Sequence, residues 1–133
     1  MPVQSPRVLY IEDHEDTREL VTLLLSQKNY EVVTGSTIEN GIALATGGNF
    51  DLYLLDSWLP DGSGLELCQR IRQFDKTTPI LFYSAAAYAS DRELALQCGA
   101  QAYMIKPSQP SDLCRLVSEL IETSKSRLSR AAY

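Results

Sequence analysis

Four features are missing from this sequence, and each absence excludes a class of protein. No apolar run approaches the roughly 20 residues that span a bilayer, and the first seven residues lack the apolar stretch of a secretory signal. The three cysteines form no CxxC pair, which indicates buried thiols in a reducing compartment rather than disulfides. Basic residues number 12 against 17 acidic ones, and the charge of −5 argues against nucleic-acid binding by this domain alone. We therefore expect a soluble cytoplasmic domain.

The length and composition favour one folded domain. A chain of 133 residues that is 44% hydrophobic and 22% charged can bury a real core but leaves little room for a second one. We expect a single domain over residues 1–133, with its ordered core at about 7–123. Residues 124–133 are polar, and they either extend the last helix or begin a linker.

Short apolar segments alternate with helix-like segments along nearly the whole chain. Strands are predicted at residues 7–11, 30–34, 52–55, 79–83 and 102–105. Helices are predicted at residues 15–28, 36–47, 64–73, 90–99 and around an apolar stripe at 113–121. The patterns Ser36-x-x-Glu39 and Ser90-x-x-Glu93 are typical of capping boxes, so we expect them to open the second and fourth helices.

Strict alternation of strands and helices predicts an α/β fold with a parallel sheet covered on both faces. Right-handed crossovers restrict the possible topologies. A flavodoxin-like (βα)5 doubly wound sheet with strand order 2-1-3-4-5 fits this length best.

Polar residues stand at the ends of several predicted strands. Glu12 and Asp13 follow the first strand and Asp56 follows the third. Ser84 and Lys106 stand at the ends of the fourth and fifth strands. Because the carboxyl ends of parallel strands meet at one edge of the sheet, we expect these five residues to converge there. Taken singly, Asp13 would be a helix cap and Lys106 a surface lysine, so only the joint pattern indicates a site.

The expected group of carboxylates has a defined chemistry. Two unit charges about 4 Å apart repel by roughly 4 kcal/mol at an effective dielectric near 20, so a proton or a cation must neutralise them. Mg²⁺ is the favoured cation because it prefers oxygen ligands and accepts carboxylates together with water and phosphate. With Mg²⁺ present, Asp56 could attack a phosphoryl donor and form an aspartyl phosphate. Lys106 and Ser84 would then bind the phosphoryl oxygens.

Five motifs in this sequence keep a specific order and spacing. They are Val8-Leu-Tyr-Ile-Glu12-Asp13, Asn40-Gly-Ile-Ala-Leu44, Asp51-Leu-Tyr-Leu-Leu-Asp56 through Leu59-Pro60 to Gly64, Ser84-Ala85, and Gly99-Ala100-x-x-Tyr103-x-x-Lys106-Pro107. In this combination the chain closely resembles the receiver domains of two-component response regulators, over about residues 7–121.

The resemblance implies a role for each matched residue of the acidic group. Asp56 would be the phosphoacceptor, and it would also bind Mg²⁺ together with Asp13 and with Glu12 beside it. The backbone carbonyl of Trp58 would complete the protein's share of the metal coordination. Lys106 would contact the phosphoryl group, and its peptide bond to Pro107 would be cis.

The resemblance also implies a switch and a partner. Ser84 occupies the position of the family's switch hydroxyl and Tyr103 that of its switch aromatic residue. A sensor histidine kinase or a histidine phosphotransfer protein would supply the phosphoryl group, and phosphorylation would reshape the surface of the fourth helix, fifth strand and fifth helix. Such a domain is no enzyme in the usual sense, because it catalyses only its own phosphorylation and dephosphorylation. The output partner and a phosphorylation-dependent homodimer are left open.

Some residues depart from the family pattern. Glu12 stands where Asp is commoner, and its longer side chain still reaches a metal-bound water. Ser57 replaces a usual apolar residue and Leu59 a usual methionine. Trp58 places a large ring beside the phosphorylation site, and we hypothesise that it shields the acyl phosphate from hydrolysis.

Three other functions compete with this interpretation. A Mg²⁺-dependent phosphohydrolase would carry a second acid two residues after its nucleophile, where this chain has Trp58. A nucleotide- or flavin-binding module is disfavoured by the acidic loop after the first strand and by the absence of GxxxxGK[ST]. A degenerate receiver that only mediates contacts would not need the intact acidic group. The lone histidine, His14, is interpreted as incidental, and Tyr88 as a packing or partner contact.

Overall fold

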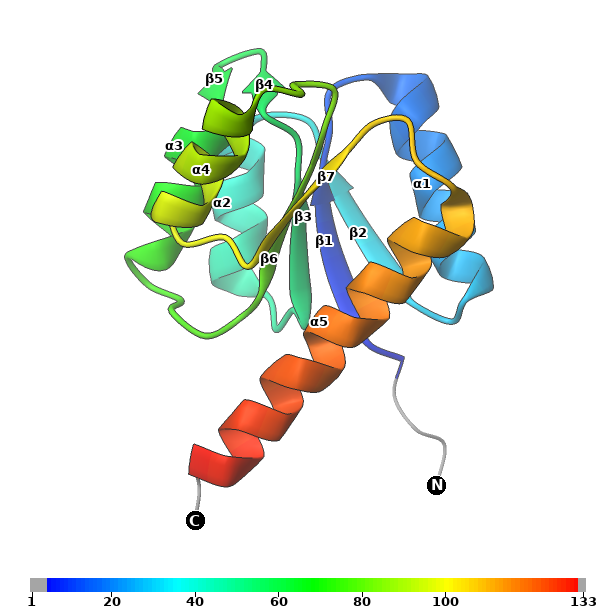
Figure 1. The fold of residues 1–133 in the computed structure, drawn as a ribbon, viewed down its shortest axis with the longest axis vertical. Coiled ribbons are helices and arrows are strands. Elements are labelled where there is room, and N and C mark those ends of the chain that lie inside the picture. Colours follow the sequence, from blue (N-terminus) through cyan, green and yellow to red (C-terminus); the bar gives the residue numbers. More distant parts are fainter. Residues whose placement is uncertain (1–4, 132–133) are drawn as a thin grey trace.

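Strands and helices alternate along the chain, and five of the strands form one parallel sheet (Figure 1). The computed structural model describes residues 5–131, and the side chains of residues 5–127. The sheet contains β1 (Arg7–Ile11), β2 (Glu31–Gly35), β3 (Leu52–Leu55), β6 (Ile80–Ser84) and β7 (Ala102–Ile105). The helices are α1 (Glu15–Gln27), α2 (Ile38–Gly47), α3 (Gly64–Arg72), α4 (Ala89–Gln97) and α5 (Pro110–Ala131).

The order of the strands confirms the predicted topology. The sheet runs β2-β1-β3-β6-β7, and each neighbouring pair is parallel. Since β6 and β7 are the fourth and fifth strands of this sheet, the order is the flavodoxin-like 2-1-3-4-5. The direction of winding therefore changes between β1 and β3, which is the place where such sheets bind their ligands.

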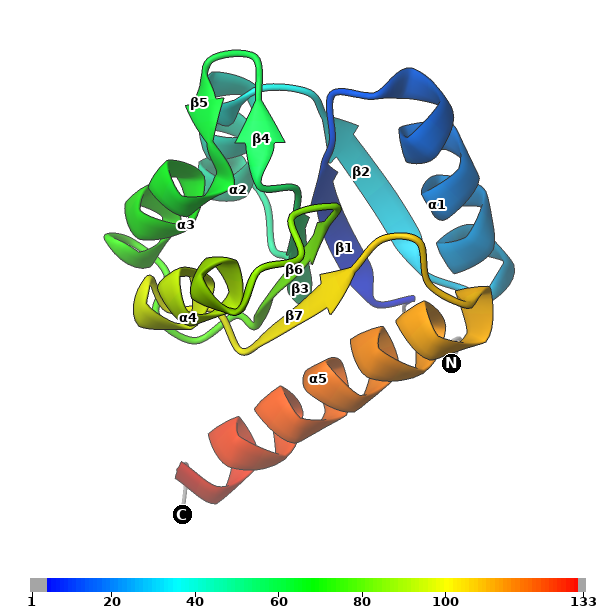
Figure 2. The same ribbon diagram turned by 45° about the horizontal axis from the view of Figure 1, so that its top comes forward.

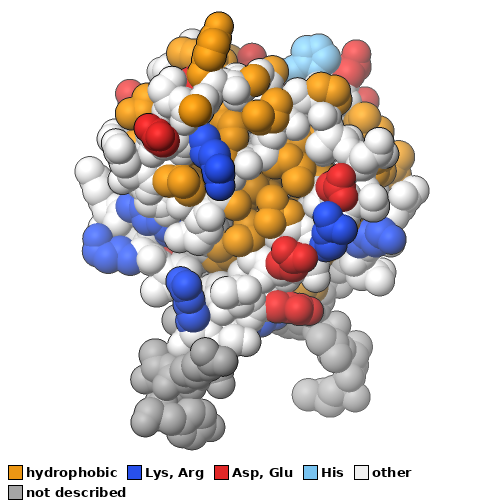
Figure 3. Space-filling view, viewed as in Figure 1, with side chains coloured by type: hydrophobic (Ala, Val, Ile, Leu, Met, Phe, Trp, Pro, Cys, Tyr) orange, Lys and Arg blue, Asp and Glu red, His pale blue; other side chains and the backbone are white. Residues whose placement is uncertain are grey.

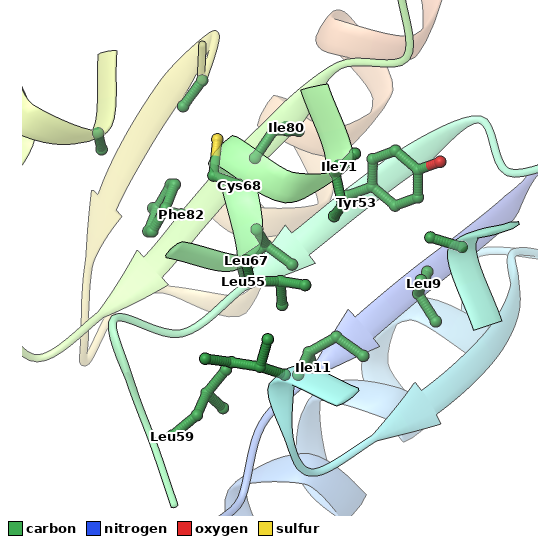
Figure 4. Close-up of a cluster of buried hydrophobic side chains, with 14 residues drawn as sticks. Leu9, Ile11, Tyr53, Leu55, Leu59, Leu67, Cys68, Ile71, Ile80 and Phe82 are labelled. Atoms are coloured by element: carbon green, nitrogen blue, oxygen red, sulfur yellow. The ribbon is translucent and has the colours of Figure 1, made fainter. Parts of the chain in front are cut away.

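Two hydrophobic layers enclose the sheet. Successive side chains of a strand point to opposite faces, so Leu9 and Ile11 of β1 belong to one layer and Val8 and Tyr10 to the other. Helices α2, α3 and α4 cover the first face, whose side chains are shown in Figure 4. Helices α1 and α5 cover the second face. Each fully buried Leu or Ile stabilises the fold by roughly 1.5–3 kcal/mol, so these layers hold the strand ends in fixed positions.

The segment after β3 contains a hairpin that the sequence pattern did not predict. Strands β4 (Trp58–Leu59) and β5 (Gly62–Ser63) pair antiparallel to form a separate two-stranded sheet. Figure 2 shows this hairpin standing at the end of the sheet where β1 and β3 finish. Asp61, in its turn, accepts hydrogen bonds from the backbone N–H groups of Ile38 (2.8 Å) and Glu39 (3.2 Å). The hairpin is thus fastened to the first turn of α2.

Both predicted capping boxes are wrong, because the N-cap residues of α2 and α4 are not the predicted serines. Helix α2 is capped by Thr37, whose hydroxyl accepts a hydrogen bond from the N–H of Asn40 at 3.0 Å, and not by Ser36. Helix α4 begins after Tyr88, whose N–H donates to the carboxylate of Asp91 at 3.1 Å. Ser36 and Thr37 are adjacent and can each cap a helix, and the N-cap residue of α4 lies two residues before Ser90, so the sequence pattern alone does not identify either N-cap residue.

The last helix is much longer than its apolar stripe. Helix α5 continues to Ala131 and projects beyond the sheet (Figures 1 and 2), so the polar segment extends the helix as far as the structure describes it. Residues 132–133 lie outside the described part of the chain. Of the three free cysteines only Cys68 is fully buried, which corrects part of the prediction made for them. Within residues 5–131, no helix has the length and apolar character needed to cross a membrane.

Candidate metal and phosphoacceptor site

The residues expected at one edge of the sheet do converge there. Glu12 and Asp13 directly follow β1, Asp56 directly follows β3, and Lys106 directly follows β7. Ser84 is the last residue of β6. The cause is the parallel register, which ends all of these strands at the same edge.

Three carboxylates form the centre of the site. One carboxylate oxygen each from Glu12, Asp13 and Asp56 lies within 4.8 Å of the others. Glu12 is buried and Asp13 is exposed, while the side chain of Asp56 is 13% exposed. Hard oxygen ligands at this spacing, open to solvent on one side, suit Mg²⁺ with its remaining positions filled by water or phosphate.

Lys106 is the cation nearest to these carboxylates. Its ammonium forms a short ion pair with Glu12 and lies 3.7 Å from Oδ2 of Asp56. One ammonium thus faces three carboxylates, and the site keeps an excess of negative charge. The peptide bond between Lys106 and Pro107 is cis, as the family resemblance implied.

The charges in this cluster shift the ionisation of Asp56 and Glu12 in opposite directions. Burial raises the pKa of Asp56 to about 6, and hydrogen bonding and repulsion with Glu12 add to the rise, while the charge of Lys106 opposes it. Burial acts on Glu12 in the same sense, but hydrogen bonds with Lys106 and Asp56 outweigh it and lower the pKa of Glu12. Glu12 therefore stays ionised, and Asp56 becomes the group that exchanges a proton near pH 6.

Glu12 has two further partners that sequence reasoning missed. The hydroxyl of Tyr10 donates to Oε1 at 3.4 Å, and the N–H of His14 donates to Oε2 at 3.3 Å. Burial, followed by the charges of Glu12 and Asp56, raises the pKa of Tyr10, so its phenol keeps the proton that it donates. The signal that could have indicated this contact is Tyr10 itself, a hydroxyl-bearing residue among the apolar residues near the end of β1.

His14 caps α1, a role that the sequence taken residue by residue predicted for Asp13. Its Nδ1 accepts a hydrogen bond from the N–H of Thr17 at 3.2 Å. The capping role accounts for His14 without any part in phosphoryl transfer. It also leaves the side chain of Asp13 available to the acidic cluster.

The loop after Asp56 is held against the Asp56 carboxylate by backbone contacts. The N–H of Ser57 donates to Oδ1 of Asp56 at 2.8 Å, and the N–H of Gly64 donates to the carbonyl of Ser57 at 2.8 Å. A Cβ at Gly64 would lie only 2.0 Å from the carbonyl oxygen of Asp56, so glycine is required there. Pairing with Ser63 fixes the backbone of Trp58, while its ring is 70% exposed.

Ser84 and Tyr103 are joined through one short loop. The buried Ser84 hydroxyl accepts a hydrogen bond from the N–H of Ala86 at 3.1 Å. The hydroxyl of Tyr103 donates to the carbonyl of Ala86 at 2.7 Å and lies 3.4 Å from the hydroxyl of Ser57. The Tyr103 ring stacks on Phe82, with ring centres 5.9 Å apart. Ser84 and Tyr103 thus both hydrogen-bond the backbone of Ala86.

The sequence of this chain is similar to that of known proteins. The family described as response regulator receiver domain matches residues 8–118. The transcriptional regulatory protein DltR of Streptococcus agalactiae is 34% identical over 125 residues, covering 94% of this chain and 55% of the relative. The response regulator ArlR of Staphylococcus saprophyticus is 32% identical over 115 residues, covering 86% and 52%. The chain thus spans about half the length of these curated relatives.

Solved structures show the same fold. A CheY-like receiver domain protein from Methanospirillum hungatei superposes with a TM-score of 0.89 at 26% identity, covering 92% of this chain and 98% of the other. The non-phosphorylated HemR receiver domain of Leptospira biflexa gives a TM-score of 0.82 at 33% identity, covering 88% and 94%.

Proposed function

This chain belongs to the response regulator receiver domain family and is a phosphoacceptor of two-component signal transduction, and we propose that Asp56 is the residue that accepts the phosphoryl group. The observation that carries the proposal is the convergence of Glu12, Asp13 and Asp56 within 4.8 Å, beside the ammonium of Lys106. Asp56 is the member of this cluster whose pKa lies near 6, so it is mostly ionised at neutral pH and can act as a nucleophile.

The proposed reaction transfers a phosphoryl group from the phosphohistidine of a histidine kinase or a histidine phosphotransfer protein. An oxygen of Asp56 forms the new bond to phosphorus while the bond from phosphorus to the imidazole nitrogen breaks, and that nitrogen keeps the electron pair. The positive charge of Mg²⁺, when bound, would stabilise the negative charge on the phosphoryl oxygens. Glu12, Asp13, Asp56 and the carbonyl of Trp58 would hold the metal. Lys106, already 3.7 Å from Asp56, would bind one phosphoryl oxygen.

The contacts of Ser84 and Tyr103 suggest how phosphorylation reaches the surface. The Ser84 hydroxyl accepts from the N–H of Ala86 and keeps its own proton to donate to a phosphoryl oxygen, so a shift of Ser84 toward the phosphoryl group would draw along the loop that also binds Tyr103. Tyr103 lines a surface hollow of about 480 Å³ together with Tyr88, Met104 and Ile105. Figure 3 shows apolar side chains gathered in the middle of the molecular face seen in Figure 1. We propose the surface of α4, β7 and α5 as the one that changes.

The remaining parts of the function follow from the family. We propose that the chain catalyses only its own phosphorylation and dephosphorylation, as a single domain in the cytoplasm. We propose a regulatory output, which is supported by the relatives DltR, a transcriptional regulatory protein, and ArlR, a response regulator. Experiment must identify the output partner and test for a phosphorylation-dependent homodimer. A partner other than this domain would carry any contact to DNA, since its own charge is −5.

The test is phosphorylation by a small-molecule phosphodonor, with and without Mg²⁺, followed by intact mass. We expect one added phosphate that requires Mg²⁺ and is lost in Asp56→Asn. Asp51→Asn is the matched control, because Asp51 lies before the same strand, at its opposite end, and should leave phosphorylation intact. An adduct that survives in Asp56→Asn would refute the assignment, and sustained turnover of a phosphate ester would favour the hydrolase instead.

Two further variants test the switch and the shield. Ser84→Ala should still accept phosphate but lose the phosphorylation-dependent change at Tyr103, measured by amide hydrogen exchange of β7. An unchanged response in Ser84→Ala would count against the proposed coupling. Trp58→Ala should shorten the lifetime of the acyl phosphate, and an equal lifetime would end the shielding hypothesis.

A further inference from the structure

Arg18, in the first turns of α1, makes a contact that the proposed mechanism does not use. Its Nη1 donates to the carbonyl oxygen of Glu12 at 2.9 Å and lies 3.5 Å from that of Asp13. Several acids stand near it in sequence, yet within residues 5–127 Arg18 forms no ion pair at 4.0 Å or less. Its guanidinium is therefore directed at the backbone of the two acidic residues.

We propose that Arg18 is a positioning residue for the metal site, an inference that rests on the proposed function and adds a residue to it. Its role is to fix the peptide between Glu12 and Asp13, so that both carboxylates face Asp56 before the metal arrives. A half-buried carbonyl needs a donor, and a guanidinium gives a stronger, charge-assisted one than water does. Groups that orient metal ligands in this way set metal affinity without touching the metal.

The surroundings of the two acids show why such a contact is needed. Glu12 is already fixed at its other polar atoms, because its N–H donates to Gly35 and its carboxylate binds Lys106. Asp13 is exposed and follows immediately, so its direction depends on the backbone between the two residues. Only three residues separate the end of β1 from the start of α1. Arg18 spans this short connection from the helix side and limits how far it can rotate.

Two possible roles of Arg18 predict opposite results. If Arg18 acted only through its charge, its removal would strengthen Mg²⁺ binding, because a cation near the cluster repels the metal. If Arg18 positions the acids, its removal weakens Mg²⁺ binding, because the ligands must be reordered when the metal binds. The sign of the change therefore separates the two roles.

The experiment is calorimetric titration of the full chain with Mg²⁺, without any phosphodonor. We expect Arg18→Met to weaken Mg²⁺ binding by roughly tenfold, in line with other groups that orient metal ligands. Arg18→Lys, which keeps the charge but cannot reproduce the planar contact, should be intermediate. Arg115→Met is the matched control: it removes the same charge from an exposed residue of α5 and should bind Mg²⁺ like the wild type. Unchanged or tighter binding by Arg18→Met would overturn the inference.

A second measurement guards against a merely structural effect. The rate of phosphorylation should be followed against Mg²⁺ concentration, beside thermal unfolding of each variant. We expect Arg18→Met to raise the half-saturating Mg²⁺ concentration while the rate at saturating Mg²⁺ changes little. A lower melting temperature with an unchanged half-saturating concentration would overturn the inference but leave the proposed function intact. A wild-type chain that neither binds Mg²⁺ nor accepts phosphate would overturn both.

Discussion

The two ends of the sheet treat a partly buried aspartate in opposite ways. Asp56 lies at the carboxyl end, where the N–H of Ser57 is its close donor and the carboxylate of Glu12 faces it. Asp75 lies at the amino end, between α3 and β6, and accepts hydrogen bonds from the hydroxyl of Tyr53 at 2.7 Å and from the N–H groups of Thr77 and Thr78 at 3.2 and 3.1 Å. Both aspartates are partly buried, but Asp75 has more hydrogen-bond donors than Asp56.

The pKa values follow this difference. Burial raises the pKa of both groups, yet at Asp75 hydrogen bonds from Thr78 and Tyr53 outweigh it and the pKa is lowered. At Asp56 the neighbouring Glu12 adds to the effect of burial, and the pKa rises to about 6. Arg7, also at the amino end, is paired with Glu31 at 2.8 Å. The charged groups at the amino end therefore have hydrogen-bond donors or ion-pair partners within the protein. At the carboxyl end, the excess negative charge is neutralised only when a proton or a cation binds or a phosphoryl group with its metal is added.

The largest expected effect comes from Gly64→Ala at the carboxyl end. The added Cβ would lie 2.0 Å from the carbonyl oxygen of Asp56, so the backbone of Asp56 must move. We expect a loss of about 3 kcal/mol in the free energy of unfolding and a much slower phosphorylation. Gly47→Ala is the control, because a Cβ there has no neighbour within 4 Å and alanine favours the helix. Urea denaturation that gave equal stabilities for the two variants would contradict this account.

The next largest effect is expected for Lys106→Met. The change leaves the buried Glu12 and its neighbour Asp56 without their shared ammonium. Breaking such a pair from one side should cost roughly 2–3 kcal/mol at pH 7, because an uncompensated charge stays partly buried. Added Mg²⁺ should return part of that stability. Urea denaturation with and without Mg²⁺ measures this. If Lys106→Met were as stable as the wild type without Mg²⁺, the negative charges at the carboxyl end would not need Lys106 to balance them.

A smaller effect is expected in the pH dependence of stability. The folded pKa of Asp56, about 6, lies above the ordinary value near 3.9, so the folded state holds its proton more tightly. Stability should therefore fall as the pH rises from about 4 to about 6, by about 1–2 kcal/mol after solvent screening is allowed for. Asp56→Asn should lose this slope when urea denaturation is repeated across that range. A slope that persists in Asp56→Asn would assign it to another group.

Much of this architecture was predictable because buried strands and helices leave a recognisable pattern of apolar residues in the sequence. β3 is covered on both faces and is a fully buried apolar run, and both β3 and the apolar edge strand β7 have the predicted extent. Strand order then placed Glu12, Asp13 and Asp56 together without any contact being known. The family resemblance added the cis bond before Pro107.

Other contacts could not be predicted, because they depend on side chains that reach across the backbone. Arg18 binds the carbonyl of Glu12 in the connection before its own helix, and Asp61 binds the N–H groups of the first turn of α2. No sequence pattern predicts either bond. Two neighbouring residues could each have capped α2, and only the register of the helix chose Thr37. Asp75 shows the same limit, since its three donors come from two separate segments.

The smallest expected effect comes from Tyr53→Phe, which removes a hydrogen-bond donor at the amino end. Asp75 would lose its hydroxyl donor but keep the N–H groups of Thr77 and Thr78. One such hydrogen bond contributes about 1 kcal/mol to stability. Because the folded pKa of Asp75 is lowered, its contribution is present above the ordinary pKa near 3.9 and is lost as the pH falls. Tyr53→Phe should therefore differ most from wild type in urea denaturation at pH 7 and converge with it in acid. Phosphorylation of Asp56 and binding of Mg²⁺ should be unchanged, because the substitution leaves the charges at the carboxyl end as they were. A change in either would mean that the two ends of the sheet are coupled through β3.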